Sequence, residues 1–277
     1  MQVEVGFTYL LTALILLPFY ARIIFIFLTN RKYRDVFCYR IMIQIGLIQC
    51  STAPVYALVG LAHLLNKDHF HLAAQGEALV AAELRVEAIL SLVLALDRMK
   101  IICGLNFPQV VQTIIIVLSY VFGICFVVLL ISPYAGCVVT PGKFLISYDA
   151  AKPYSYVVQK TGTAVIIGAS LLTLIVYVII IAYLIRRKMA FQTTEKISSH
   201  ERTIFCYASV RFLFDVVLSV LYNSVQVQQN PLTDFCIIYG YILNNLMLST
   251  VLYLTFYKSL RQEYLPCRKL NVASLLT

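Results

Sequence analysis

Seven long apolar segments dominate this 277-residue sequence and leave little room for a water-soluble fold. A hydrocarbon layer about 30 Å thick is crossed by a helix of roughly 20 apolar residues, and segments of that length recur along the chain. They cover residues 6–28, 38–62, 74–103, 110–132, 156–185, 203–225 and 235–257. The sequence therefore predicts an all-α membrane protein, built as one domain of seven transmembrane helices with a tail at residues 258–277.

The composition supports this prediction. The chain is 61% hydrophobic and only 13% charged, whereas about a quarter of the residues in soluble domains are charged. Its eight cysteines form no CxxC pair, and no motif typical of hydrolases, zinc proteases or nucleotide-binding enzymes occurs. We therefore expect no metal site, no cofactor and no enzymatic activity.

The distribution of positive charge predicts how the bundle is oriented. Fourteen Lys and Arg residues lie in the first, third and fifth connections and the tail, and three lie on the other side, at Lys67, Lys143 and Lys152. Positive residues accumulate on the cytoplasmic side of membrane proteins. We therefore expect an outside N-terminus and a cytoplasmic C-terminus. On this interpretation the net charge of +9 reflects topology and contact with anionic membrane lipid, and nucleic acid is not an expected partner.

An acidic residue followed by an arginine, Asp97–Arg98, closes the third segment. Charged residues at a helix end often mark only the membrane boundary. The sequence LDRM at residues 96–99 also resembles the acid–Arg motif that closes the third helix of rhodopsin-like receptors. In that interpretation Arg98 belongs to a cytoplasmic switch, and Glu201, near the inner start of the sixth segment, is the candidate to hold it at rest.

Several charged residues lie inside the third and sixth segments: Glu83, Arg85, Glu87, Arg211 and Asp215. Such charges are costly in a membrane and mark paired or functional sites. At a rise of 1.5 Å per residue, Glu87 lies about 16 Å above Arg98, and Asp215 lies about 18 Å from the start of its own segment, so the two share a depth. Helical phase places Glu83, Glu87 and Arg98 on one inward stripe, while Arg85 points elsewhere. Arg211 and Asp215 can pair with each other. Structural pairing and coupling to a ligand both remain open.

Two cysteines are predicted to lie outside the membrane. Cys137 belongs to the long connection at residues 133–153, and Cys236 begins the seventh segment. Because extracellular thiols oxidise readily, these two are candidates for a disulfide.

The start of the tail carries an apolar stripe made by Tyr257, Leu260, Tyr264 and Leu265. This pattern predicts either a short helix on the inner leaflet or a disordered basic tail. Cys267 would then be placed for palmitoylation.

Three stretches together resemble the nematode serpentine chemoreceptors, class XA or the related class T: CYRIMIQIGLIQC, LVLALDRMKII and LYLTFYKSLRQEY, at residues 38–50, 92–102 and 252–264. The resemblance implies a rhodopsin-like G-protein-coupled receptor for an unknown small molecule, in the plasma membrane of sensory cells. It would signal to a heterotrimeric G protein as the inner ends of its third and sixth helices rearrange. This chain departs from rhodopsin-like receptors at Gln49, where an acidic residue is usual, and it lacks a proline in the sixth and seventh segments.

Two other classes of protein remain open. A ligand-gated channel or transporter would need a polar stripe along several helices, and the fourth and fifth segments are almost wholly apolar. A structural membrane protein that senses nothing is the third interpretation.

Overall fold

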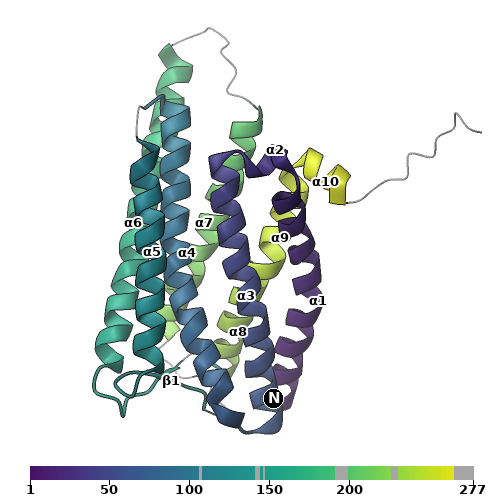
Figure 1. Ribbon diagram of the computed structural model, residues 1–277, viewed down its shortest axis with the longest axis vertical. Helices are drawn as coiled ribbons and strands as arrows, with labels where there is room; N and C mark the ends of the chain where they lie inside the picture. The colour runs from purple at the N-terminus through teal and green to yellow at the C-terminus, as the bar shows by residue number, and fades with distance from the viewer. Residues whose placement is uncertain (106–107, 141–143, 146, 191–198, 226–229, 265–277) are drawn as a thin grey trace, which may run out of the picture.

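The computed structural model describes residues 1–105, 108–140, 144–145, 147–190, 199–225 and 230–264, which form one bundle of long helices (Figure 1). The helices are α1 (Gln2–Thr29), α2 (Arg31–Arg34), α3 (Phe37–Leu65), α4 (Leu72–Cys103), α5 (Gln109–Ile131), α6 (Ser155–Ala190), α7 (Ser199–Val225), α8 (Pro231–Ile242), α9 (Ser249–Phe256) and α10 (Lys258–Tyr264). A 3-10 turn, η1 (His69–His71), precedes α4, and a π-helical turn, η2 (Leu243–Leu248), joins α8 to α9. Strands β1 (Cys137–Val138) and β2 (Ser147–Tyr148) form a small antiparallel sheet. Every predicted apolar segment is therefore helical.

In the described part of the chain, six helical stretches are long and apolar enough to cross a membrane. They are Gln2–Thr29, Phe37–Leu65, Gln109–Ile131, Ser155–Arg186, Phe205–Tyr222 and Pro231–Phe256, the last of which combines α8, η2 and α9. The chain is thus an all-α, multi-pass membrane protein. Helix α4 is the exception among the long helices, because Glu77, Glu83, Arg85 and Glu87 interrupt its apolar sequence.

The distribution of side chains is the reverse of that in a soluble protein. Helix α4 packs against α3, α5 and α6, and its Glu77, Arg85, Glu87 and Arg98 are buried. The outer surfaces of α1, α5 and α6 instead carry many exposed large apolar side chains. Broad apolar surfaces of this kind require an apolar neighbour, and buried charges in a membrane bundle face its interior. The polar interior is therefore where a functional site must be sought.

Helices α1 and α3 approach each other closely at two glycines. A Cβ atom at Gly6 would lie 2.6 Å from the backbone oxygen of Gly60, and a Cβ atom at Gly60 would lie 2.6 Å from that of Gly6. Small residues at such contacts let membrane helices pack backbone against backbone. This contact fixes α1 against the rest of the bundle.

The end of the bundle that carries the N-terminus also carries the connection between α5 and α6, which contains β1 and β2 and is called the β1–β2 connection below (Figure 1). Lys152 fastens this connection, because its Nζ donates to the backbone oxygens of Ser132 at 3.0 Å and Ala135 at 2.8 Å. Cys137 pairs with Tyr148 across the two strands. The connection thereby holds Tyr148 over the buried part of α4.

The opposite end of the bundle carries α2 and α10 (Figure 1). The chain turns at Tyr257, whose backbone is extended, and then forms α10. Leu260 and Tyr264 are buried, Arg261 is exposed, and the Arg22 guanidinium lies 4.8 Å from the centre of the Tyr264 ring. The predicted short amphipathic helix is confirmed over these residues, while Leu265 and Cys267 lie outside the described part of the chain.

Candidate functional site

A buried arginine on α7 binds two carboxylates. Nη2 of Arg211 lies 2.7 Å from Oε1 of Glu87 on α4, and Nε lies 3.4 Å from Oδ2 of Asp215, one helical turn further along α7. Both Arg211 and Glu87 are almost completely buried. The predicted Arg211–Asp215 pairing is confirmed, and so is the common depth of Glu87 and Asp215. Arg211 thus links α7 to α4 in addition to pairing with a residue of its own helix.

The π-helical turn η2 and the first residue of α9 supply further partners for the same arginine. Nη2 of Arg211 donates to Oδ1 of Asn245 at 2.9 Å, and Nη1 donates to the Asn244 carbonyl and to Oγ of Ser249 at 3.1 Å. The Asn244 side chain donates to Oδ1 of Asp215 at 2.6 Å. A π-helical turn changes the backbone hydrogen-bond pattern, and such turns are frequent at functional sites. The sequence carries no proline here, and this turn was not predicted.

Gln49 extends the network to α1 and α3. It is fully buried, and its Nε2 donates to Oε1 of Glu87 at 2.5 Å. Its Oε1 accepts hydrogen bonds from Tyr20 on α1 at 2.5 Å and from Ser249 at 3.0 Å. An amide can donate to a carboxylate and accept from hydroxyls at once. Gln49 therefore uses both ends to join α1, α3, α4 and α9.

Glu83 lies outside this network. It is half-buried, and its Oε1 accepts a hydrogen bond from Ser51 on α3 at 2.6 Å, while its Oε2 has no hydrogen-bond partner among the described residues. Helical phase placed it on the same stripe as Glu87. The stripe faces both α7 and α3: Glu87 reaches Arg211 on α7, whereas Glu83 faces α3.

Arg85 points away from the network, as predicted, and contacts different neighbours. Its Nη2 donates to the hydroxyl of Tyr148 at 2.9 Å, and its Nη1 donates to the Ala81 carbonyl. The guanidinium carbon lies 4.5 Å from the centre of the Phe126 ring on α5. The sequence did not assign these partners, because one of them lies in a connection and not on a helix.

Asp97 and Arg98 bind each other at the other end of α4. Nη2 of Arg98 lies 2.5 Å from Oδ2 of Asp97, and both side chains are buried. Cys38 and Tyr257 are among the groups that interact electrostatically with Arg98. The side chain of Glu201, the predicted partner, lies outside the described part of the structure. In this arrangement Arg98 is turned into the bundle.

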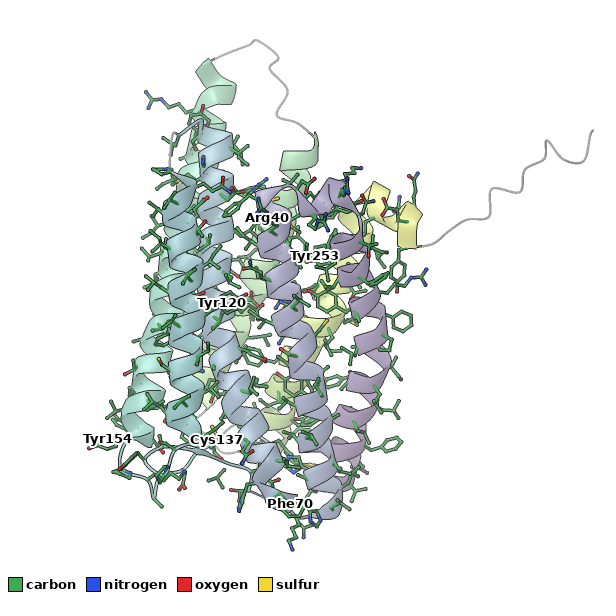
Figure 2. All side chains as sticks on the ribbon, in the orientation of Figure 1. Arg40, Phe70, Tyr120, Cys137, Tyr154 and Tyr253 are labelled. Carbon is green, nitrogen blue, oxygen red and sulfur yellow. The ribbon has the colours of Figure 1, made fainter. Side chains whose placement is uncertain are left out.

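A column of tyrosines lies between the Arg211 network and Arg98. The Tyr207 and Tyr253 rings stack with centroids 4.6 Å apart, and Tyr253, which is labelled in Figure 2, also contacts the Tyr20 ring at 6.3 Å and the Tyr257 ring at 6.1 Å. Tyr20 bonds Gln49, and Tyr257 is close to Arg98. The column therefore links both polar sites through packed side chains, and the sequence analysis did not identify it.

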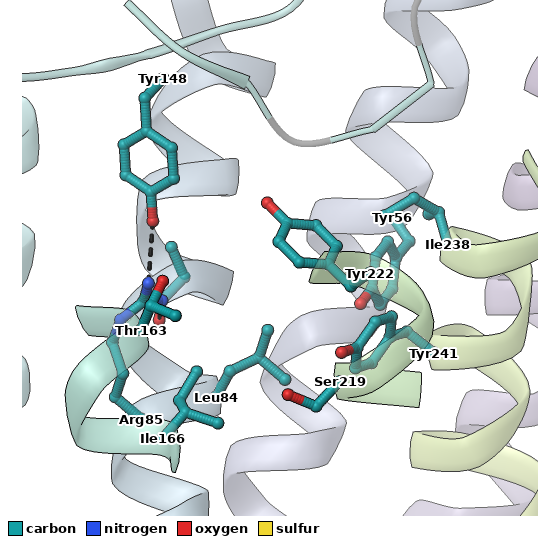
Figure 3. A pocket seen from close by; sticks show the side chains of 11 residues that line it. Tyr56, Leu84, Arg85, Tyr148, Thr163, Ile166, Ser219, Tyr222, Ile238 and Tyr241 are labelled. Carbon is teal, nitrogen blue, oxygen red and sulfur yellow. Dashed lines mark hydrogen bonds between the residues drawn. The ribbon is translucent and has the colours of Figure 1, made fainter. Parts of the chain in front are cut away.

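A pocket opens beside the network, between α3, α4, α6, α7 and α8. Its first cavity has a volume of about 50 Å³. Arg85 and Thr163 line one side of it, and Tyr56, Tyr222 and Tyr241 line the other (Figure 3).

A second cavity of about 60 Å³ adjoins the first. The two share Leu84, Ile166, Ser219 and Tyr241 in their walls. The second reaches Glu87 and Asp215. The two neighbouring cavities together border Arg85 on one side and the carboxylates that hold Arg211 on the other.

The predicted Cys137–Cys236 disulfide is wrong, because both thiols are free. Cys137 packs with Phe126 and Tyr148 in a small apolar cluster, whereas Cys236 is exposed on α8. Burial raises the pKa of Cys137 to about 12. A thiol with such a pKa stays protonated at neutral pH and reacts slowly.

Two further carboxylates, Glu77 on α4 and Asp234 on α8, are buried and were not among the predicted site residues. Glu77 of α4 is 5% exposed, and its Oε2 has no hydrogen-bond partner among the described residues. The signal was available, since Glu77 belongs to the same interrupted apolar run as Glu83 and Glu87.

Comparison with known proteins adds nothing to these observations: the sequence matches no known protein family and no curated protein.

Proposed function

We propose that the chain is a seven-helix receptor in the plasma membrane of a sensory cell. In this proposal its N-terminus is outside and its C-terminus is in the cytoplasm. A small molecule binds in the pocket between α4, α6, α7 and α8 and changes how the inner ends of α4 and α7 are arranged. A heterotrimeric G protein reads that change.

The length and burial of α4 support its role as the seventh crossing. Its 32 residues extend about 48 Å, which exceeds the hydrocarbon thickness of about 30 Å. Its charges at Glu77, Arg85 and Glu87 are buried against neighbouring helices. A helix whose charges face protein can cross a membrane although its average composition is too polar.

One observation carries the proposal: α4 and α7, which both line the pocket, are also tied together by Arg211. Glu87 and Asp215 line the inner cavity and also bind Arg211. A ligand that contacts two arrangements of these helices differently shifts the balance between them. Helix α4 continues from this point to Asp97 and Arg98, so a shift of α4 against α7 would reach the cytoplasmic end.

The state of Arg98 fits a resting receptor. It is 2% exposed and bound to Asp97. A G protein cannot contact a side chain in that position. Activation would therefore have to separate the inner ends of α4 and α7 and release the Arg98 guanidinium.

The test is G-protein activation in a heterologous reporter cell exposed to a panel of small volatile and soluble compounds. We expect at least one compound to activate the wild type, and Arg98→Ala to abolish the response at unchanged surface expression. Arg40→Ala is the matched control, because Arg40 is an exposed arginine near the same end of the bundle (Figure 2). Undiminished signalling by Arg98→Ala would contradict the switch. Ligand-evoked conductance of the purified chain without a G protein would contradict the receptor class and favour a channel.

A further inference from the structure

We propose that the pocket binds a small monocarboxylate and that Arg85 pairs with its carboxylate group. The inference deepens the proposed function, on which it rests, because it names the ligand class of the same pocket.

Arg85 is a buried cation whose described partners are all neutral. It is 5% exposed, and an arginine side chain stays protonated in proteins. Its hydrogen bonds go to the Ala81 carbonyl and the Tyr148 hydroxyl, and its third neighbour is the Phe126 ring. No carboxylate among the described residues forms an ion pair with it. A buried charge without a counter-ion is costly, so an anion would complete this site.

The guanidinium is accessible from the pocket. Arg85 lines the first cavity, and two of its five N–H groups are used within the described residues. Its Nε is buried and has no hydrogen-bond partner there. Figure 3 shows the Arg85 guanidinium beside Thr163 and directed at the Tyr148 hydroxyl, across the pocket from Tyr222 and Tyr241. Donors without a described partner therefore remain on a buried cation whose side chain lines the cavity, although the Nε edge of its guanidinium faces Gly162 on α6.

Gly162 on α6 provides the space that Arg85 occupies. A Cβ atom at this position would collide with the Nε, Nη2 and Cζ atoms of Arg85. Gly168, on the same helix, has no atom within 4 Å of such a Cβ. The chain thus offers a substitution that displaces the guanidinium without removing its charge, together with a matched control.

The shape of the donor and the remaining walls define the ligand. A guanidinium presents a planar fork that matches a carboxylate, and the bonds are charge-assisted. Leu84, Ile166 and Ile238 add apolar surface to the first cavity. In the first cavity these features fit a carboxylate attached to an apolar group.

Volume and charge limit the ligand further. One water molecule, which has a single non-hydrogen atom, needs roughly 10–15 Å³ of cavity volume. The two cavities, of about 50 and 60 Å³, therefore hold together roughly eight to ten non-hydrogen atoms. The inner cavity is lined by Glu87 and Asp215, which share the single cation Arg211. A second carboxylate on the ligand would be repelled there. The site therefore favours a monocarboxylate over a dicarboxylate.

The test is ligand binding to the purified full chain in lipid nanodiscs at neutral pH. The probes are hexanoate, hexanamide, 1-hexanol and adipate, and the readouts are calorimetry and thermal stabilisation. We expect hexanoate to bind about 10- to 100-fold more tightly than hexanamide or hexanol, the range of a charge-assisted hydrogen bond. Adipate should bind more weakly than hexanoate.

The variants separate the charge of Arg85 from its structural role. Arg85→Met should remove the preference for hexanoate over hexanamide, and Arg85→Lys should keep part of it. Gly162→Ala should weaken hexanoate binding while Gly168→Ala leaves it unchanged. Tyr148→Phe removes the hydrogen bond to the β1–β2 connection but keeps the cation, so the preference for hexanoate should persist. If Arg85→Met fails to fold, the comparison of the two glycine variants still decides.

Equal binding of hexanoate and hexanamide, or equal effects of Gly162→Ala and Gly168→Ala, would overturn the carboxylate site. The outcome for the receptor is separate. Binding that depends on Arg85 without G-protein activation would retain the site and contradict the proposed function. Activation by neutral compounds regardless of Arg85 would retain the function and contradict the site.

Discussion

Removing Arg211 should destabilise the bundle more than any other single change to a charged residue of its network. Arg211→Met replaces the guanidinium with an apolar chain and leaves Glu87 and Asp215 without their cation. Breaking a buried ion pair by removing one partner costs about 3–5 kcal/mol. We therefore expect Arg211→Met to lower the free energy of unfolding by about that amount.

The other two charges of the network should matter less, in a definite order. Glu87→Gln keeps an oxygen that can accept from Arg211 and Gln49, so it loses only the charge-assisted part of those bonds, about 1–2 kcal/mol. The Asp215 side chain is 32% exposed and lies 3.4 Å from Arg211. An ion pair that is partly exposed contributes about 1 kcal/mol or less, so Asp215→Asn should have the smallest effect.

The assay is denaturant unfolding of the purified variants in one detergent, followed by circular dichroism. Arg40→Met is the control, since it removes an exposed arginine by the same substitution. If Arg211→Met is no less stable than Arg40→Met, Arg211 does not hold the helices together. If Asp215→Asn is the most destabilising of the three substitutions, the burial of each charged group does not determine its contribution to stability.

Three further predictions concern other parts of the molecule. Gly60→Ala should cost about 1–3 kcal/mol of unfolding free energy, since its Cβ would press on the Gly6 backbone, while Gly168→Ala, measured in the same assay, should be neutral or slightly stabilising. Maleimide should label Cys236 at pH 7.5 much faster than Cys137, because burial raises the pKa of Cys137 to about 12 and leaves little of the reactive thiolate. Treatment with a reductant before labelling should change the labelling rate of neither Cys137 nor Cys236. If reduction increases the number of labelled thiols, the Cys137–Cys236 disulfide exists.

The helices could be predicted because membrane thickness sets a length that apolar residues must fill. Each predicted segment ends within a few residues of a helix end, for example 109–131 in the structure against 110–132 in the prediction. The shared depth of Glu87 and Asp215 followed from a constant rise per residue. Both results depend only on the regular geometry of one helix at a time.

Relations between helices were harder to predict. Arg211 binds Glu87 as well as its neighbour Asp215 because α7 packs beside α4 at that level, and no property of either helix alone determines this. Arg85 finds Tyr148 through the β1–β2 connection, whose course the sequence does not reveal.

The disulfide prediction failed for a related reason. The predicted topology places Cys137 and Cys236 outside the membrane, where thiols can oxidise. A disulfide also needs the two side chains to meet in a specific geometry. Cys137 lies in β1 and packs with Phe126 and Tyr148, whereas Cys236 is exposed on α8.

Nucleotide exchange on a purified heterotrimeric G protein, reconstituted with the chain in nanodiscs, tests the central claim most directly. The receptor account predicts that at least one small molecule accelerates exchange by the wild type. It also predicts that Arg98→Ala loses this acceleration while Arg40→Ala keeps it. Acceleration that survives in Arg98→Ala, or a ligand that binds the pocket and leaves exchange unchanged, would contradict the account.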